Sequence, residues 1–159
     1  MARKSSPGIK VGLISDTHGL LRPEAVRALG GVQHIIHGGD IGSAAVLEGL
    51  RAIAPVEAVR GNNDREAWAA AIPDQLQLEI ARVCIHVRHD LNELDLDPVA
   101  TGFRIVVTGH SHNPAIAERA GVLYVNPGSA GPRRFRLPVS VGFLELSRGT
   151  SRAWIEQLL

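Results

Sequence analysis

Cysteine is nearly absent from the sequence. Cys84 is the single cysteine among 159 residues, which excludes an internal disulfide and a cysteine-rich zinc site. We therefore expect a reducing compartment, the cytoplasm. No apolar run approaches the roughly 18 residues that a membrane-spanning helix needs, so we expect no membrane association. Residues 1–8 are basic and polar with no apolar segment behind them, which argues against a secretory signal and predicts a flexible N-terminal tail.

The fraction of aromatic residues and the net charge are also low. Phe, Trp and Tyr together make up 4% of the chain, and the formal net charge is +1. The core must therefore be built mainly from Val, Ile, Leu and Ala, and the near-neutral charge argues against DNA or RNA as a partner. The length predicts one domain over residues 9–159. The sequence does not determine the oligomeric state and is compatible with a homo-oligomer.

The chain does contain a regular series of short apolar runs. Residues 9–15, 34–37 and 56–60 predict strands, and the segments between them have helical spacing. This alternation predicts parallel strands joined by right-handed crossovers. From residue 75 onward the pattern predicts hairpins and one further buried strand, over residues 75–89, 103–108, 115–126 and 139–158. We therefore predict an α/β fold of two mixed β-sheets packed face to face, with helices outside.

Polar clusters follow most of these apolar runs. Asp16 and His18 come just after the first predicted strand, and residues two apart in an extended chain point the same way. One oxygen and one nitrogen ligand can therefore converge on a metal ion. Further clusters follow in order: His37-Gly38-Gly39-Asp40, Gly61-Asn62-Asn63-Asp64, His89-Asp90 and Gly109-His110-Ser111-His112. Ligands of parallel sheets bind beyond the carboxyl ends of the strands, where three of the five clusters are expected.

These clusters supply the donors that a site for two divalent ions needs. Two ions about 3.5–4 Å apart can hold the attacking and leaving oxygens of a phosphoryl transfer. Such a site requires one bridging carboxylate, together with imidazoles and oxygen donors for both ions. The candidates are Asp16, His18, Asp40, Asn62, His89, His110 and His112. A mixed nitrogen and oxygen donor set favours manganese, with nickel, iron or zinc as alternatives, over magnesium or calcium.

The order of the motifs and the residues in them resemble those of the calcineurin-like metallophosphoesterase superfamily. Its pattern is D-x-H, G-D, G-N-x-D/E, an isolated His that Gly usually follows, and G-H-x-H, and the match runs from about Ile9 to Ser147. Asn126-Pro127-Gly128-Ser129 and the following Pro132-Arg133 resemble the small, uncapped bacterial and archaeal phosphodiesterase branch. The resemblance implies a four-layer sandwich and a metal-dependent phosphodiesterase that acts on a small phosphate ester.

The resemblance also implies a role for each candidate residue. The first metal would be held by Asp16, His18 and His112, and the second by Asn62, His89 and His110. Asp40 would bridge the two ions, and a hydroxide between them would attack the phosphorus. Asp64 would fix the local geometry of the Gly61-Asn62-Asn63-Asp64 segment.

Two positions depart from the family pattern. The family often has a histidine after the Asn of G-N, where it acts as general acid, but here the residue is Asn63. Asn63 cannot supply a proton near neutral pH, so the general acid is not identified. Asp90 stands where glycine is usual. Its carboxylate either adds negative charge near the second metal or points away from it.

Other readings remain open at the level of sequence. His37 either supports the site or is a buried, hydrogen-bonded histidine, and Asn126 either forms a turn or supports the site. The arginines at 133, 134 and 136 either guide a phosphate or form a solvated basic loop. The alternative functions are a non-catalytic scaffold, like the phosphoesterase-like subunit of the retromer sorting complex, and a nuclease. A scaffold has no need for the four histidines at 18, 89, 110 and 112.

Overall fold

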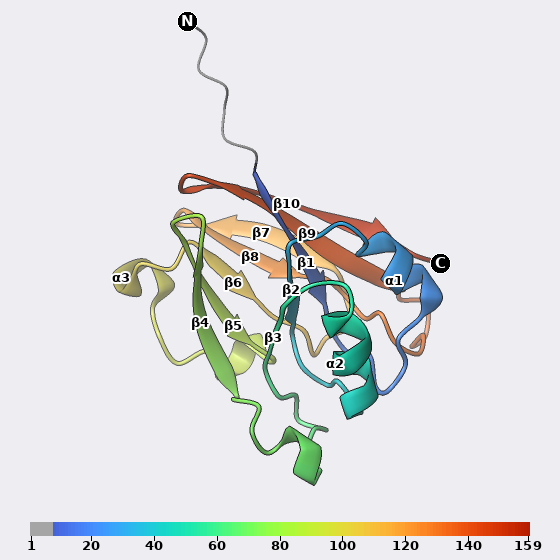
Figure 1. The fold of residues 1–159 in the computed structure, drawn as a ribbon. Coiled ribbons are helices and arrows are strands. Elements are labelled where there is room, and N and C mark those ends of the chain that lie inside the picture. The colour runs from blue at the N-terminus through green and yellow to red at the C-terminus, as the bar shows by residue number, and fades with distance from the viewer. Residues whose placement is uncertain (1–7) are drawn as a thin grey trace, which may run out of the picture.

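A computed structural model describes residues 8–159, so the expected tail lies, apart from Gly8, outside the described residues. The chain forms two five-stranded sheets (Figure 1). Sheet A has, in spatial order, β10 (Thr150–Gln157), β9 (Ser140–Ser147), β1 (Ile9–Ile14), β2 (His34–His37) and β3 (Val56–Ala58). Sheet B has β4 (Gln75–Ile80), β5 (Val83–Arg88), β6 (Ile105–Val107), β8 (Val122–Asn126) and β7 (Ala115–Arg119).

Both sheets are mixed, as predicted. In sheet A, β1, β2 and β3 are parallel, whereas β9 and β10 run antiparallel beside them. In sheet B, β5, β6 and β8 are parallel, and the edge strands β4 and β7 are antiparallel. In register, Ile14 is the partner of His37, and His37 is the partner of Ala58. The loops that follow β1, β2 and β3 therefore leave sheet A side by side.

Successive residues of the central strands point to opposite faces of sheet A and build two cores. Leu13 packs between the sheets with Ile36 and Val107 in one buried cluster. Its neighbour Ile14 packs on the other face of sheet A, against residues of α1 (Pro23–Ala28) and α2 (Ala44–Arg51). The longer helices thus cover the outside of sheet A (Figure 1). The predicted sandwich of two mixed sheets with helices outside is confirmed.

The remaining helical pieces are short. They are η1 (Ala67–Ala69), η2 (Leu91–Glu93) and α3 (Pro98–Thr101). The segment after β3 had favoured a helix from 65 to 71, but only one 3₁₀ turn forms. The hydrogen bonds of this segment span three residues, such as the one from Ala70 N to the carbonyl of Ala67 at 3.2 Å, and Pro73, which has no N–H and disfavours helical backbone before it, prevents a further turn. Within the described residues, no helix is long and apolar enough to cross a membrane.

Candidate metal centre

Backbone hydrogen bonds join the loops after β1 and β2 and so bring the first two motifs together. Asp16 N donates to the carbonyl of Gly39 at 2.9 Å, and His18 N donates to that of Asp40 at 2.9 Å. These bonds continue the pairing of β1 with β2 beyond the ends of the strands. Gly39 adopts φ +102°, and a Cβ added there would lie 2.6 Å from His89 Nδ1, so glycine is required at this close approach.

Most of the predicted ligands have an unusual backbone conformation. Positive φ angles, between 47° and 71°, occur at Asp16, His18, Asp40, His110 and His112. Non-glycine residues adopt this left-handed region only rarely, and such strain concentrates at functional sites. The clustering of left-handed residues at the predicted ligands is a signal that the sequence motifs do not contain, and it supports one common function for these loops.

One group of donor atoms forms around Asp16. Its Oδ1 lies 3.4 Å from His112 Nε2 and 4.0 Å from His18 Nε2. The two histidine Nε2 atoms are 3.3 Å apart, and their rings are stacked. The three residues therefore present donors to one small volume, as the sequence had predicted for the first metal.

A second group adjoins the first and shares Asp16. The Nε2 of His89 lies 3.3 Å from Asp40 Oδ2 and 3.9 Å from Asp16 Oδ1. Asp40 Oδ2 is also 3.9 Å from His18 Nε2. Both carboxylates therefore face both groups. Asp40 lies between one histidine of each group, which is the position that a bridging ligand needs.

The orientation of His89 fits a bound cation. Its Nδ1 lies 2.7 Å from the carbonyl oxygen of Gly38, so Nδ1 carries the proton and donates it. In the neutral ring, Nε2 then directs a lone pair toward carboxylate oxygens, which are themselves acceptors. Both His89 Nε2 and Asp16 Oδ1 are buried and lack a hydrogen-bond partner among the described residues. A divalent ion among these atoms would satisfy them all, so the donor set fits the metal that the motifs predict.

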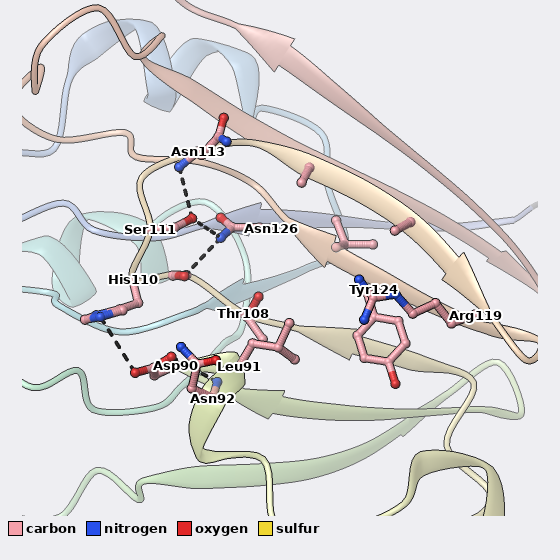
Figure 2. A pocket seen from close by; sticks show the side chains of 14 residues that line it. Asp90, Leu91, Asn92, Thr108, His110, Ser111, Asn113, Arg119, Tyr124 and Asn126 are labelled. Carbon is pink, nitrogen blue, oxygen red and sulfur yellow. Dashed lines mark hydrogen bonds and ion pairs between the residues drawn. The ribbon is translucent and has the colours of Figure 1, made fainter.

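Asn62 and His110 lie beside these groups rather than within them. With His89 they line a cavity of about 210 Å³. The Nε2 of His110 faces the carboxylate of Asp90 (Figure 2), and the distance from Nε2 to Asp90 Oδ2 is 3.7 Å. Asp90 therefore points toward the site, which decides between the two orientations left open by the sequence.

Asn63 and Asp64 hold the loops in place. Both the backbone N and the side-chain Nδ2 of Asn63 donate to the carboxylate of Asp40, at 2.9 and 3.0 Å. Asp64 is 3% exposed, and its carboxylate accepts hydrogen bonds from the backbone N of Ile41, Gly42 and Gly61. Asp64 thus ties the loop after β2 to the loop after β3.

Hydrogen bonding keeps the two central carboxylates ionised. Burial raises the pKa of Asp40, but the adjacent His89 imidazole and the hydrogen bond from the backbone N of Asn63 outweigh burial and hold the pKa well below its usual range. Burial also raises the pKa of Asp16, but the adjacent His112 imidazole and the hydrogen bond from Ser15 outweigh it, so the pKa is lowered. Ionised carboxylates are the form that binds metal.

His37 is a buried structural residue. Its Nδ1 accepts a hydrogen bond from Gly39 N at 3.0 Å, and its Nε2 lies 3.0 Å from Thr17 Oγ1. Burial lowers the pKa of His37 to about 4. Both ring nitrogens are engaged and the ring is neutral at pH 7, so His37 is not placed to act as a general acid. Of its two sequence readings, the hydrogen-bonded core histidine applies.

Two further residues support the ligand loops. Asn126 Nδ2 donates to the carbonyl of Gly109 at 2.9 Å, and its Oδ1 accepts from Gly128 N at 2.9 Å. Asn126 therefore forms the turn and also fixes the Gly109–His112 loop. Ser15, which the motif analysis had passed over, donates its hydroxyl to Asp16 Oδ2 at 2.7 Å. The position of Ser15 next to Asp16 was the one signal in the sequence for this supporting role.

Comparison with known proteins agrees with this arrangement. Residues 9–149 match the family model of the calcineurin-like phosphoesterase superfamily domain. The chain belongs to the calcineurin-like phosphoesterase superfamily. A probable metallophosphoesterase of Methanothermobacter thermautotrophicus is 36% identical over 130 residues, which cover 75% of this chain and 76% of that protein. A phosphodiesterase of Methanocaldococcus jannaschii is 28% identical over 159 residues, which cover 88% and 95% of the two chains.

The fold is also shared with solved structures. Vacuolar protein sorting 29 of Cryptosporidium parvum superposes with a TM-score of 0.76 at 20% identity, covering 96% of this chain and 98% of that one. At this identity the likeness shows the fold alone. Membership of the calcineurin-like phosphoesterase superfamily supports phosphoesterase hydrolase activity with divalent metal ions, and it confirms the resemblance read from the motifs.

Proposed function

We propose that the protein is a phosphodiesterase that binds two divalent transition-metal ions. The observation that carries the proposal is the convergence of three imidazoles on two ionised, buried carboxylates. The Nε2 atom of each imidazole lies within 4.0 Å of an oxygen of at least one of the carboxylates. Without a cation these groups would leave His89 Nε2 and Asp16 Oδ1 unsatisfied. A cation relieves that cost and explains why the strained loops are retained.

The proposed ligands take the first group as it stands and add to His89 the two residues beside it, Asn62 and His110. Asp16, His18 and His112 hold the first ion, and Asn62, His89 and His110 hold the second. Asp40 would bridge the two ions: its Oδ2 faces one histidine of each group, as Asp16 Oδ1 also does, and the resemblance to the family assigns the bridge to Asp40. Manganese is the first choice of metal, with nickel, iron or zinc as alternatives, since the donors are imidazoles and carboxylates.

The ions, when bound, supply an activated water nucleophile and neutralise charge on the phosphate. The residues of the chain provide the geometry. Asn63 fixes the orientation of Asp40, and Asp64 fixes the loops that carry Asp40 and Asn62. An amide side chain is not an acid near neutral pH, so Asn63 offers the leaving group no proton. The site is therefore suited to diesters whose leaving groups depart without an acid.

The partner that this site favours is a small phosphate ester. The metal centre lies on loops at one end of the sandwich, and the near-neutral net charge of +1 offers little attraction to a nucleic acid. These features favour hydrolysis of small diesters over nuclease activity. The single cysteine remains the reason to propose the cytoplasm as compartment.

A scaffold function is the second candidate, because vacuolar protein sorting 29 has the same fold. The complete donor set separates the two. A scaffold gains no stability from buried atoms that lack partners, whereas an enzyme needs them free to bind metal.

Turnover by stripped and reloaded protein tests the proposal. The protein is freed of metal with a chelator, and hydrolysis of bis(4-nitrophenyl) phosphate and 4-nitrophenyl phosphate is measured after addition of each metal. We expect diester hydrolysis that depends on added metal and that Asp16→Asn abolishes. Inert protein under every metal condition would favour the scaffold, and equal activity in the chelated protein would exclude the metal-dependent mechanism.

A further inference from the structure

A second cavity, of about 320 Å³, adjoins the metal centre. It lies against β7 and β8 and beside the segment 90–92 (Figure 2). His110 and Asp90 line one end of it, and Tyr124 and Arg119 lie at the other. His110 and Asp90 also line the smaller cavity that contains Asn62 and His89. The two cavities are therefore neighbours that share His110 and Asp90, so a substituent of a phosphate ester held at the metal centre lies close to the larger cavity.

Small residues on the edge strand create this space. Ala115 and Ala117 face the cavity from β7, and Ala117 lies directly opposite Tyr124 in the strand register. A larger side chain at 117 would cover the tyrosine ring. The volume is within the range of about 300–1,000 Å³ that is typical of small-molecule sites.

The far end of the cavity offers flat surfaces. The guanidinium carbon of Arg119 lies 5.6 Å from the centroid of the Tyr124 ring, so a planar cation and an aromatic ring stand together. Leu91, which is 38% exposed, adds an apolar wall between the two ends. Aromatic rings and guanidinium groups both stack on planar ligands, and this stacking tolerates different ring systems.

Polar groups in the cavity remain available to a ligand. The side-chain hydroxyls of Thr108 and Tyr124 form no hydrogen bond with another described residue, and neither does the side-chain amide of Asn113. The charged side chains that line the cavity are Arg119 at one end and Asp90 at the other. This lining contains no cluster of cations that would receive a second phosphate. It suits an uncharged planar group with polar edges.

We propose that this cavity binds a planar aromatic substituent of the substrate, of the size of a nucleoside, while the phosphate lies at the metal centre. This inference rests on the proposed function and narrows it to nucleoside phosphodiesters. The stacking surface is formed by Tyr124 and Arg119, and the free hydroxyls and amide bind the edges of the ring.

Three esters with one leaving group test the inference. They are the methyl, the octyl and the thymidine 5′ esters of 4-nitrophenyl phosphate, hydrolysed by the metal-loaded protein. We expect kcat/KM for the thymidine ester to exceed that for the methyl ester by about tenfold or more, since a stacked base contributes on that scale. The octyl ester should gain less, because it cannot stack.

Variants locate the preference in the cavity. Tyr124→Ala and Ala117→Leu should bring the ratio of the thymidine to the methyl ester close to one, whereas Tyr124→Phe should keep most of it. Ala117→Leu fills the cavity without truncating the tyrosine. Arg152→Ala is the matched control, because Arg152 also lies over an aromatic ring, 4.8 Å from Trp154, but on β10. It should keep the preference.

The outcomes separate the inference from the proposed function. Equal kcat/KM for all three esters, or a preference for the octyl ester, overturns the inference and leaves the phosphodiesterase proposal standing. If no ester is hydrolysed, the proposed function fails, and a binding measurement then tests whether the cavity takes a planar group. Calorimetry would then compare thymidine 5′-monophosphate with methyl phosphate. Tighter binding of the nucleotide that Tyr124→Ala abolishes supports the cavity, and equal binding overturns it.

Discussion

The carboxylate of Asp90 lies 3.7 Å from the His110 imidazole, measured from Oδ2 to Nε2. This pairing engages Nε2 and leaves Nδ1 of His110 as the nitrogen that can face the second ion. Histidines that bind metal commonly give their other nitrogen to a carboxylate, which fixes the ring and raises its basicity. We therefore propose that Asp90, at a position where the superfamily usually has glycine, positions His110 for the proposed second metal.

We predict that Asp90→Gly weakens binding of the second ion by about 10–100-fold, the range typical of such supporting partners. Calorimetric titration of chelated protein with Mn²⁺ measures the change. Asp95→Asn is the control, because Asp95 is an exposed carboxylate five residues further along the chain, with no hydrogen bond to another described residue. Tighter binding in Asp90→Gly would mean that Asp90 draws His110 away from the metal.

Loss of Asp40 should disturb both ions. Asp40→Ala removes the carboxylate that faces both His18 and His89, whereas His112→Ala removes a donor from the first group only. We expect Asp40→Ala to lose both ions and more than about 100-fold in turnover, beyond the loss from a supporting residue. Metal analysis of Asp40→Ala, Asp16→Ala and His112→Ala decides the matter. Because Asp16 also faces both groups, loss of both ions in Asp16→Ala alone would transfer the bridging role to Asp16.

The identity of the leaving group should control the rate of the wild-type protein. A positioned general acid contributes about 10²–10⁴-fold, and Asn63 instead donates to Asp40. We predict a steep fall in rate as the pKa of the leaving alcohol rises, and diesterase activity above monoesterase activity. Asn63→His should flatten the dependence and raise monoester turnover. Asn63→Ala controls for the lost hydrogen bond to Asp40. A wild-type rate that does not change with the pKa of the leaving alcohol would contradict the prediction.

His37 should make the folded state sensitive to acid. The folded protein holds the pKa of His37 at about 4, because the ring is buried, against 6.5 for a histidine exposed to water. Between pH 6.5 and 4, His37 is protonated in the unfolded chain but stays neutral in the folded chain. The stability contributed by neutral His37 is therefore complete above pH 6.5 and falls by up to about 3 kcal/mol as the pH drops to 4.

Urea unfolding of chelated protein across this range measures the effect as a difference between variants. His37→Asn should be less stable than the wild type at pH 7 and should show a shallower loss of stability between pH 6.5 and 4. His34→Asn makes the same change at the partly exposed start of β2 and serves as the control. Parallel pH profiles for His37→Asn and the wild type would show that His37 is not the group responsible.

Much of the fold could be predicted because its signals are local. The hairpin that turns at Ala81, the buried runs of β1 and β2 and the polar clusters behind them are all readable in the sequence. Near Trp68 only a 3₁₀ turn formed instead of the expected helix, because local spacing does not reveal that the chain crosses here from sheet A to sheet B.

The convergence of five of the candidate ligands could be predicted for a similar reason, since the motifs fix which residue types follow which strands. The orientation of their side chains could not. The contact of Asp90 with His110 depends on how β5 and β6 align, and the cavity in front of Tyr124 depends on Ala117 lying opposite it in register. Such relationships between segments distant in the chain arise only in the folded state.

The number of metal ions needed for activity tests the central claim most directly. Chelated protein is titrated with Mn²⁺ while bound metal and hydrolysis of bis(4-nitrophenyl) phosphate are measured in the same sample. The account predicts no activity without metal and full activity at two ions per chain, with His18→Ala and His89→Ala each binding one ion at most. Full activity in metal-free protein, or at one ion per chain, would contradict it.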